Sequence, residues 1–234
     1  MKIRTTLAAV AALLTLAPAT QAQQIGIGTM GQGTSGYSIG AAIARVLAQE
    51  GISALVQPSA GTSAYLPLID MGELDLGIAN AIEVNDAANG TGDFEGRALK
   101  NISPAARLYP FRVGIFARDD SGIETVADLA GAFFAVGSGK VTEVDASVGG
   151  LHWLPLPGTP EAEARLQGVV PQAYIDVIQP REGLTGVDSE MPVMAYDYML
   201  VVGAHVPDET VTAIVTARWS NHLPPFVTWT PTQC

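Results

Sequence analysis

The first half of the chain alternates between helical and strand-like patterns of hydrophobic residues. Residues 37–51 carry apolar side chains three and four positions apart, which is the spacing of one buried helix face, and Gly51 is suited to ending that helix. A second helical pattern covers residues 62–75, and short apolar runs at residues 52–61 and 74–80 are typical of strands. The resulting strand-helix-strand-helix-strand order predicts right-handed crossovers and a parallel sheet.

The second half of the chain continues with shorter strand-like runs and two further helical patterns. Because strands and helices keep alternating, the whole chain is predicted to belong to the α/β class. The strand-like runs are residues 102–109, 111–121, 132–138, 151–157 and 198–204, and the helical patterns cover residues 161–174 and 208–223.

The chain opens with a basic segment, an apolar segment and a small-residue segment in that order. Lys2 and Arg4 precede an apolar run at residues 7–16, and residues 20–22 (TQA) suit a cleavage site. The apolar run is too short to cross a bilayer, which takes roughly 20 residues. We therefore expect residues 1–22 to be a secretory signal peptide, and the mature protein to reside in the periplasm without direct insertion into the membrane.

The overall charge narrows the range of partners. The formal net charge is −11, so nucleic acid and anionic membrane surfaces are not expected to bind the protein. Cys234 is the single cysteine, and no intramolecular disulfide can form.

A glycine-rich stretch at residues 25–40 contains the pattern G-x-G-x-x-G. A dinucleotide-binding loop needs a full strand before the first glycine and an acidic residue at the end of the second strand. Here only three residues separate the expected cleavage site from Gly26, and the second strand ends in Val56-Gln57-Pro58. The stretch is therefore predicted to be a strand-to-helix turn that does not bind a dinucleotide.

Small hydroxylated residues follow each of the first three predicted strands. In an open α/β sheet, ligands settle at the carboxyl ends of the strands, where helix N-termini offer free N–H groups to an anion. Each residue could instead be an ordinary cap or turn residue, and Thr62 or Ser63 suits the N-cap of the second helix. The candidates for binding a carboxylate are Thr29, Ser35, Tyr37, Ser59, Gly61, Thr62, Ser63 and Asn80.

No catalytic or metal-binding motif stands out elsewhere in the chain. The GSGK segment at residues 137–140 lacks the remaining positions of a phosphate-binding loop. His152, His205 and His222 are too far apart in sequence for a local metal motif, and no nucleophile-base arrangement is recognisable. The sequence therefore predicts a protein that is not an enzyme and has no cofactor or metal.

Four blocks of sequence resemble the solute-binding subunits of TRAP transporters of the TAXI group. This resemblance implies a two-lobed, type II periplasmic-binding-protein fold that closes on a small organic acid, such as glutamate or a dicarboxylate, and delivers it to the TRAP permease subunits in the membrane. It also adds Tyr109, in the third block, to the candidate site. The blocks are IGIGTMGQGTSGYSIGAAIARVL, QPSAGTSAYLPLIDMGELDLGIAN, RLYPFRVGIFARDDSGIETVADLAG and GLHWLPLPGTPEAEARL.

The resemblance is interrupted after the ADLAG segment. Family members continue there into a strand, a second glycine-rich loop and much of the second lobe, whereas this chain runs directly into GAFFAVGSGK. We interpret that segment as a later family strand that follows an internal deletion; alternatively it is a degraded form of the first strand and loop. The expected organisation is a largely complete lobe one at residues 23–130, a truncated lobe two at 131–170, and at 171–234 a return segment with a C-terminal helix packing on lobe one.

Single positions in the site also depart from the family pattern. Ile82 stands where the family has an acidic residue after the third strand, and Asn80 where it usually has glutamine. Phe111 stands where an acidic residue often follows the LYP segment. These departures affect the expected affinity for a ligand more than the relationship of the chain to the family.

Three functions are compatible with these observations. The leading interpretation is a TRAP-type solute-binding protein for a small organic acid. The second is a truncated binding-protein lobe that contacts a permease or sensor without capturing a ligand. The third is an exported oxidoreductase that uses the glycine-rich stretch.

Overall fold

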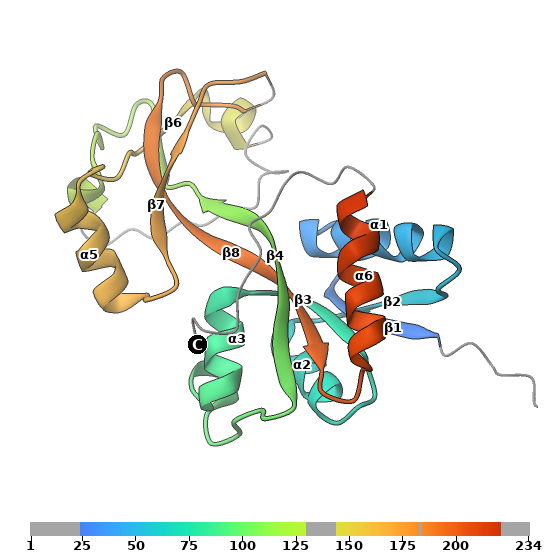
Figure 1. Cartoon of the computed structure of the whole chain (residues 1–234). Coiled ribbons are helices and arrows are strands. Elements are labelled where there is room, and N and C mark those ends of the chain that lie inside the picture. Colours follow the sequence, from blue (N-terminus) through green and yellow to red (C-terminus); the bar gives the residue numbers. More distant parts are fainter. Residues whose placement is uncertain (1–23, 130–143, 183, 221–234) are drawn as a thin grey trace, which may run out of the picture.

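The computed structural model describes residues 24–129, 144–182 and 184–220 (Figure 1). Its first five elements follow the predicted order. They are β1 (Ile25–Met30), α1 (Ser35–Gln49), β2 (Ala54–Ser59), α2 (Thr62–Asp70) and β3 (Leu76–Asn80). β1 pairs in parallel with both β2 and β3, which confirms the predicted parallel sheet for this region.

The ends of the first two helices differ in how they are capped. Thr34 is the N-cap of α1, and its side chain accepts a hydrogen bond from the amide of Tyr37. Gly51 follows the end of α1 with a φ of 78°, as expected of a glycine at a helix C-terminus. The N-cap of α2 is Gly61, so the prediction of Thr62 or Ser63 was wrong by one position or more. Gly61 has no side chain with which to cap, so α2 begins without a side-chain cap.

The main sheet is completed by two long antiparallel strands. β4 (Ile102–Val113) and β8 (Met191–Gly203) pair with each other, and β8 also pairs with β3, giving the order β2-β1-β3-β8-β4. A further strand, β7 (Tyr174–Ile178), pairs with β8. The protein therefore has an α/β fold with a mixed sheet, in which the parallel strands lie together on one side.

Helices cover both faces of the main sheet. α1 and α6 (Asp208–Ser220) lie side by side on one face (Figure 1) and share a core with Ile27, Ile78 and Leu200. On the other face, α2, α3 (Ala81–Asn89) and the short η1 (Gly92–Phe94) surround a second core that includes Tyr65, Met199 and Val201.

Two glycines of the G-x-G-x-x-G pattern, Gly26 and Gly28, and Gly40 of α1 allow close packing. Gly26 and Gly28 lie inside β1, and a Cβ atom at Gly28 would come within 2.8 Å of the ring of Tyr65. Gly40 of α1 approaches β1 equally closely, because a Cβ atom there would lie 2.6 Å from the methyl group of Thr29. Gly28 and Gly40 let α2 and α1 approach β1 from opposite faces.

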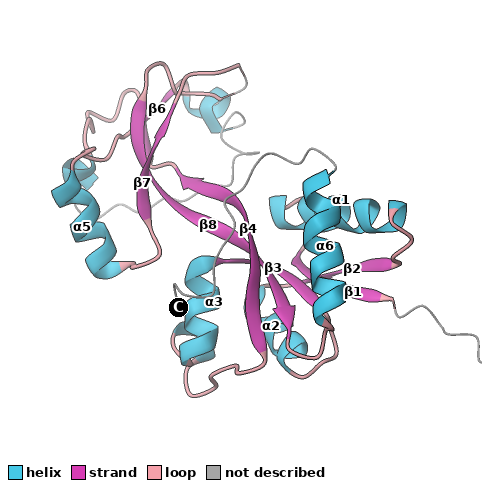
Figure 2. Ribbon diagram, viewed as in Figure 1, coloured by secondary structure: helices cyan, strands magenta, loops and turns pink. Residues whose placement is uncertain are grey.

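A smaller part of the fold lies at the far ends of β4 and β8 (Figure 2). It has few buried residues, gathered in two small clusters around Trp153, and none of the residues of α5 is buried. Its elements are β5 (Phe116–Arg118), η2 (Val126–Leu129), β6 (Leu151–Trp153), α5 (Pro160–Val169) and β7. Residues 132–138, predicted as a strand, lie outside the described residues.

Several predicted boundaries were wrong, three of them in β4, α5 and β8. Residues 102–113 form one strand instead of ending before Pro110, because β4 lies at the edge of the sheet and two register shifts accommodate its prolines. The helix predicted over residues 161–174 ends at Val169, two residues before Pro171, and is followed by the unpredicted β7. β8 begins at Met191, seven residues before the predicted strand.

Candidate functional site

The candidate site lies at the edge of the sheet where β1, β2 and β3 end and α1, α2 and α3 begin. Because β1, β2 and β3 are parallel, their carboxyl ends lie at one edge of the sheet. β8 crosses the same edge, where Tyr198 lies opposite both Asn80 of β3 and Tyr109 of β4. The site is thus built from elements that are far apart in sequence.

Glu83 in the first turn of α3 is the centre of a hydrogen-bond network. The hydroxyl of Thr62 donates to Oε2 of Glu83 at 2.7 Å, and the side-chain amide of Asn80 donates to the same oxygen. Asn80 is also the N-cap of α3, since its Oδ1 accepts from the backbone amide of Glu83 at 2.9 Å. Two of the predicted site residues therefore hold a carboxylate that belongs to the protein itself.

A buried tyrosine packs next to this network, on the side of the sheet that α2 covers. Tyr65 is fully buried, and its hydroxyl donates to the carbonyl oxygen of Ile78 at 2.5 Å. The single hydroxyl proton of Tyr65 is used in that bond, so the proton of Thr62 goes to Glu83 and the 3.5 Å contact between the two hydroxyls is secondary. Thr62, only 3% exposed, is fixed between two elements.

Four aromatic rings lie on the other side of the sheet edge. Tyr109 and Tyr198 stack with their ring centroids 5.1 Å apart, and Phe111 stacks on Tyr196 at 5.4 Å. The hydroxyl of Tyr109 donates to Oγ of Ser35, the first residue of α1, at 2.9 Å. Tyr198 is buried, whereas the other three rings are partly exposed and extend the core beneath α1.

The carboxyl group of Glu83 and the tyrosines affect one another electrostatically. Partial burial raises the pKa of Glu83 above its usual value; Asp93 and Asp86 raise it further, and the hydrogen bonds from Thr62 and Asn80 lower it. Burial also raises the pKa of Tyr65 to about 12, with smaller contributions that include the charge of Glu83.

The same charge adds to the effect of burial in raising the pKa values of Tyr196 and Tyr198. These tyrosines are neutral at physiological pH, and the site carries the negative charge of Glu83 when that group is ionised.

The other predicted site residues occupy varied positions. Thr29 is fully buried, and its hydroxyl donates to the carbonyl of Met30, so it is a structural residue of β1. Gly40 of α1 packs directly against its methyl group, so the structure gives no support to the predicted contact of Thr29 with a ligand. The remaining four, all partly exposed near the starts of α1 and α2, are Tyr37, Ser59, Gly61 and Ser63.

Sequence reasoning missed the residue at the centre of the network. Ile82 was noted only as a departure from the family pattern, which has an acidic residue there, and the carboxylate is supplied by the next residue, Glu83. The signal was present, because Asn80 and Glu83 have the spacing of an N-cap and its partner in the first helical turn. The stacking of the four aromatic rings could not be predicted from the local sequence pattern, since it depends on the register between β4 and β8.

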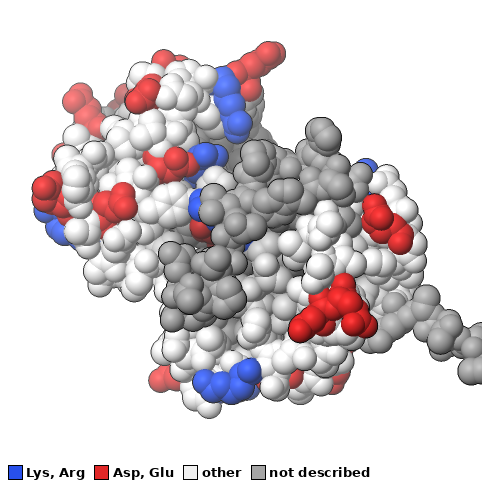
Figure 3. All heavy atoms as spheres, viewed as in Figure 1, with Lys and Arg blue, Asp and Glu red and all other residues white. Residues whose placement is uncertain are grey.

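Basic side chains on the neighbouring strands point to other acidic groups. Arg107 forms an ion pair with Asp197 at 2.8 Å and contacts Tyr174, which donates to the same carboxylate. Asp197 lies between Tyr196 and Tyr198 in β8 and so faces the opposite side of the sheet. Arg112 pairs with Asp176 of β7 at 2.6 Å. Figure 3 likewise shows acidic groups spread over this face of the molecule, with basic groups at only a few places.

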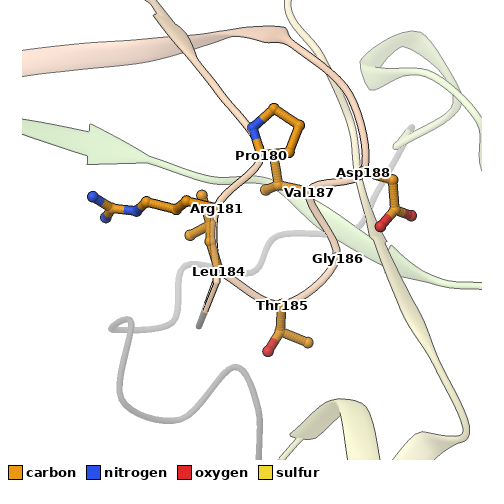
Figure 4. Close-up of a pocket in the computed structure, with 7 residues that line it drawn as sticks. All are labelled: Pro180, Arg181, Leu184, Thr185, Gly186, Val187 and Asp188. Atoms are coloured by element: carbon orange, nitrogen blue, oxygen red, sulfur yellow. The ribbon is translucent and has the colours of Figure 1, made fainter.

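One hollow of the described structure lies away from this site. It has a volume of about 530 Å³ and lies within the loop between β7 and β8 (Figure 4). The side chain of Arg181 points away from it, and the residues that line it are Pro180, Arg181, Leu184, Thr185, Gly186, Val187 and Asp188. A smaller hollow of about 300 Å³ lies at the opposite edge of the main sheet, between Ile25, Ile52 and the start of α6.

Two further properties follow from the described residues. None of the helices within residues 24–129, 144–182 and 184–220 is long and apolar enough to cross a membrane. In the same ranges, histidine, cysteine and acidic side chains form no group of three or more that could hold a metal ion.

Comparison with known families identifies the lineage of the chain. The model of the NMT1-like family matches residues 27–148, just over half of the chain. The chain belongs to the NMT1-like family. This NMT1-like match begins within β1 and extends past β5, so it includes every residue of the Glu83 network.

Several solved structures are distantly similar to this NMT1-like protein. A TctC solute-binding protein from Polaromonas is 15% identical over 86% of this chain and 84% of its own, with a TM-score of 0.48. A nutrient-binding protein from Burkholderia cenocepacia bound to methionine is 12% identical over 84% and 92%, with a TM-score of 0.45. The binding component of an ABC phosphonate transporter from Pseudomonas aeruginosa is 14% identical over 86% and 75%, with a TM-score of 0.46.

Proposed function

We propose that this NMT1-like protein is an extracytoplasmic solute-binding protein that captures a small molecule at the carboxyl edge of β1, β2 and β3. The observation that supports the proposal is the convergence there of Glu83, Thr62, Asn80, Tyr109 and Ser35. Polar side chains from β3, β4, α1, α2 and α3 meet beside partly exposed rings, an arrangement suited to orienting a small solute.

The transporter class and the ligand class are proposed from the sequence resemblance. The protein would serve a TRAP-type transporter, take up a small organic acid such as glutamate or a dicarboxylate, and pass it to the membrane permease. A carboxylate of that solute would bind at the start of α1, where the first N–H groups have no partners within the helix and Ser35 and Tyr37 lie.

The proposal is tested by adding candidate solutes to the purified mature protein. Thermal unfolding and isothermal titration would be measured with glutamate, 2-oxoglutarate, succinate and malate. A bound solute raises the unfolding temperature in a saturable way, because it binds the folded state alone. No saturable shift at millimolar concentration would count against capture of these acids. Uptake by the permease subunits, with and without the binding protein, tests the transporter class.

A second candidate is an interaction role without solute capture. It is favoured by the small part of the fold, in which α5 has no buried residue and Val169 and Val177 are 82% and 45% exposed. Binding to the permease or a sensor without any solute effect would support it. An exported oxidoreductase has less support, because Gly26 and Gly28 pack inside β1 instead of forming a loop.

A further inference from the structure

The two oxygens of Glu83 are used unequally. Thr62 and Asn80 both donate to Oε2, and within the described residues no hydrogen bond to Oε1 is formed. The orientation of Asn80 is fixed, because its Oδ1 accepts from the amide of Glu83 and its nitrogen must then face the carboxylate. Both partners are donors, so Oε2 acts as an acceptor, and Oε1 retains its capacity to accept from another molecule.

Further acidic groups lie near this carboxylate. After burial, the charges of Asp93 and Asp86 help to raise the pKa of Glu83. The arginines of β4, Arg107 and Arg112, form ion pairs with Asp197 and Asp176. No described contact supplies Glu83 with a cation from the protein.

We propose that the solute presents a protonated amine to Oε1 of Glu83, and that Glu83 is therefore the residue that selects amine-bearing solutes. The inference rests on the proposed solute-binding function and narrows its ligand class. An ammonium group would satisfy the remaining acceptor and balance the charge of the site. A carboxylate in the same place would meet a like charge.

The first test compares solutes that differ only by an amine. The pairs are L-glutamate with glutarate and γ-aminobutyrate with butyrate, measured by titration calorimetry and thermal shift. We expect each amine-bearing member to bind roughly ten- to a hundredfold more tightly than its partner, the range for one hydrogen bond to a charged group. Equal or tighter binding of glutarate or butyrate would overturn the inference and leave solute binding intact. No saturable binding by any of the four would count against both.

The second test changes the carboxylate itself. Glu83→Gln keeps the size and the acceptor for Thr62 but removes the charge, and should reduce affinity for the amine-bearing member of a pair by a similar factor. Glu73→Gln is the matched control, because Glu73 is an exposed carboxylate between α2 and β3. Unchanged affinity in Glu83→Gln would contradict the proposal. Circular dichroism and cooperative melting establish that both variants are folded.

A third measurement uses the wild-type protein and needs no variant. Affinity for an amine-bearing solute should fall as the pH is lowered through the raised pKa of Glu83, because protonation removes the charge that the ammonium binds. An affinity that instead rises towards low pH would indicate an acid bound beside a protonated Glu83, and would overturn the inference. The other titratable groups around Glu83 are Tyr65, Asp86, Asp93, Tyr196 and Tyr198.

Discussion

The hydroxyl of Tyr109 in β4 donates a hydrogen bond to Oγ of Ser35, 74 positions earlier in the chain, at 2.9 Å. This contact ties the edge strand of the main sheet to the first residue of α1. Tyr109 also stacks on Tyr198. This stacking fixes the orientation of the Tyr109 ring and therefore the position of its hydroxyl group. The contact with Ser35 fixes the N-terminus of α1 relative to the four aromatic rings of β4 and β8.

Tyr109→Phe should keep the stacked ring and lose the bond to Ser35. We expect a loss of about 0.5–1.5 kcal/mol in the free energy of unfolding, the usual net worth of one hydrogen bond. Urea denaturation of Tyr109→Phe, Ser35→Ala and the double variant measures the coupling between the two side chains. Strictly additive losses would show that the two hydroxyls do not interact in solution.

Glu83→Gln should stabilise the protein without solute at neutral pH. The folded-state pKa of Glu83 is raised, so ionisation is less favourable in the folded chain than in the unfolded chain. The resulting penalty is absent below the unfolded pKa, near 4.3 to 4.5, and is complete once the pH exceeds the folded pKa.

Urea denaturation of wild type and Glu83→Gln across this pH interval measures the difference. The advantage of the variant should shrink as the pH is lowered, and Glu73→Gln should show no such trend. A variant that is less stable than wild type at neutral pH would mean that the bonds from Thr62 and Asn80 outweigh burial.

Gly28→Ala should destabilise the fold. Its Cβ atom would lie 2.8 Å from the ring of Tyr65, which is fully buried and cannot move aside. Overpacking of this kind costs about 1–3 kcal/mol. Gly31→Ala is the matched control, since nothing lies within 4 Å of a Cβ atom there. Equal urea midpoints for the two variants would contradict the packing role assigned to Gly28.

His152 should make the small part of the fold more stable at mildly acidic pH. Its Nε2 lies 2.7 Å from the carbonyl oxygen of Ile123 and its Nδ1 lies 3.1 Å from Asp119, so a protonated ring can donate to both. The bond to Ile123 is the main cause that raises the pKa of His152, and Asp119 adds to it. Stabilisation is therefore complete below the unfolded pKa of about 6.5 and is lost as the pH rises through the folded pKa.

Amide exchange of β5 and β6 at about pH 5.5 and about pH 8 would detect this change, since those pH values bracket an ordinary histidine pKa. Protection should be greater at the lower pH after correction for intrinsic exchange rates. His152→Gln should remove the difference, and a difference that persists in that variant would assign it to another group.

The parallel half of the fold was predictable because its signals are local. The apolar spacing within residues 37–51 and the interior apolar run at residues 74–80 depend only on neighbours in sequence, and both correspond to observed elements. β4 and β7 were mispredicted because their limits depend on partners. Pro110 is tolerated in β4 only because that strand is at the sheet edge, which sequence pattern does not reveal.

The proximity of Thr62 and Asn80 was predictable, but the carboxylate that they contact was not. The carboxyl edge follows from the order of elements, and it brings Thr62 and Asn80 together. What the sequence did not reveal is that both residues contact Glu83, so the site holds an internal carboxylate. Thr29 illustrates the same limit, since a hydroxylated residue at a strand end can be wholly enclosed by an approaching helix.

The connection between the two parts of the fold sets how they can move. β4 and β8 remain paired from Ile102 opposite Gly203 to Val113 opposite Met194, and this pairing runs from the main sheet into the small part (Figure 2). Two flexible linkers would let the two parts of the fold rotate freely. Two hydrogen-bonded strands instead resist bending and deform mainly by twisting. A change in the angle between the two parts would therefore twist these two strands and strain the hydrogen bonds between them.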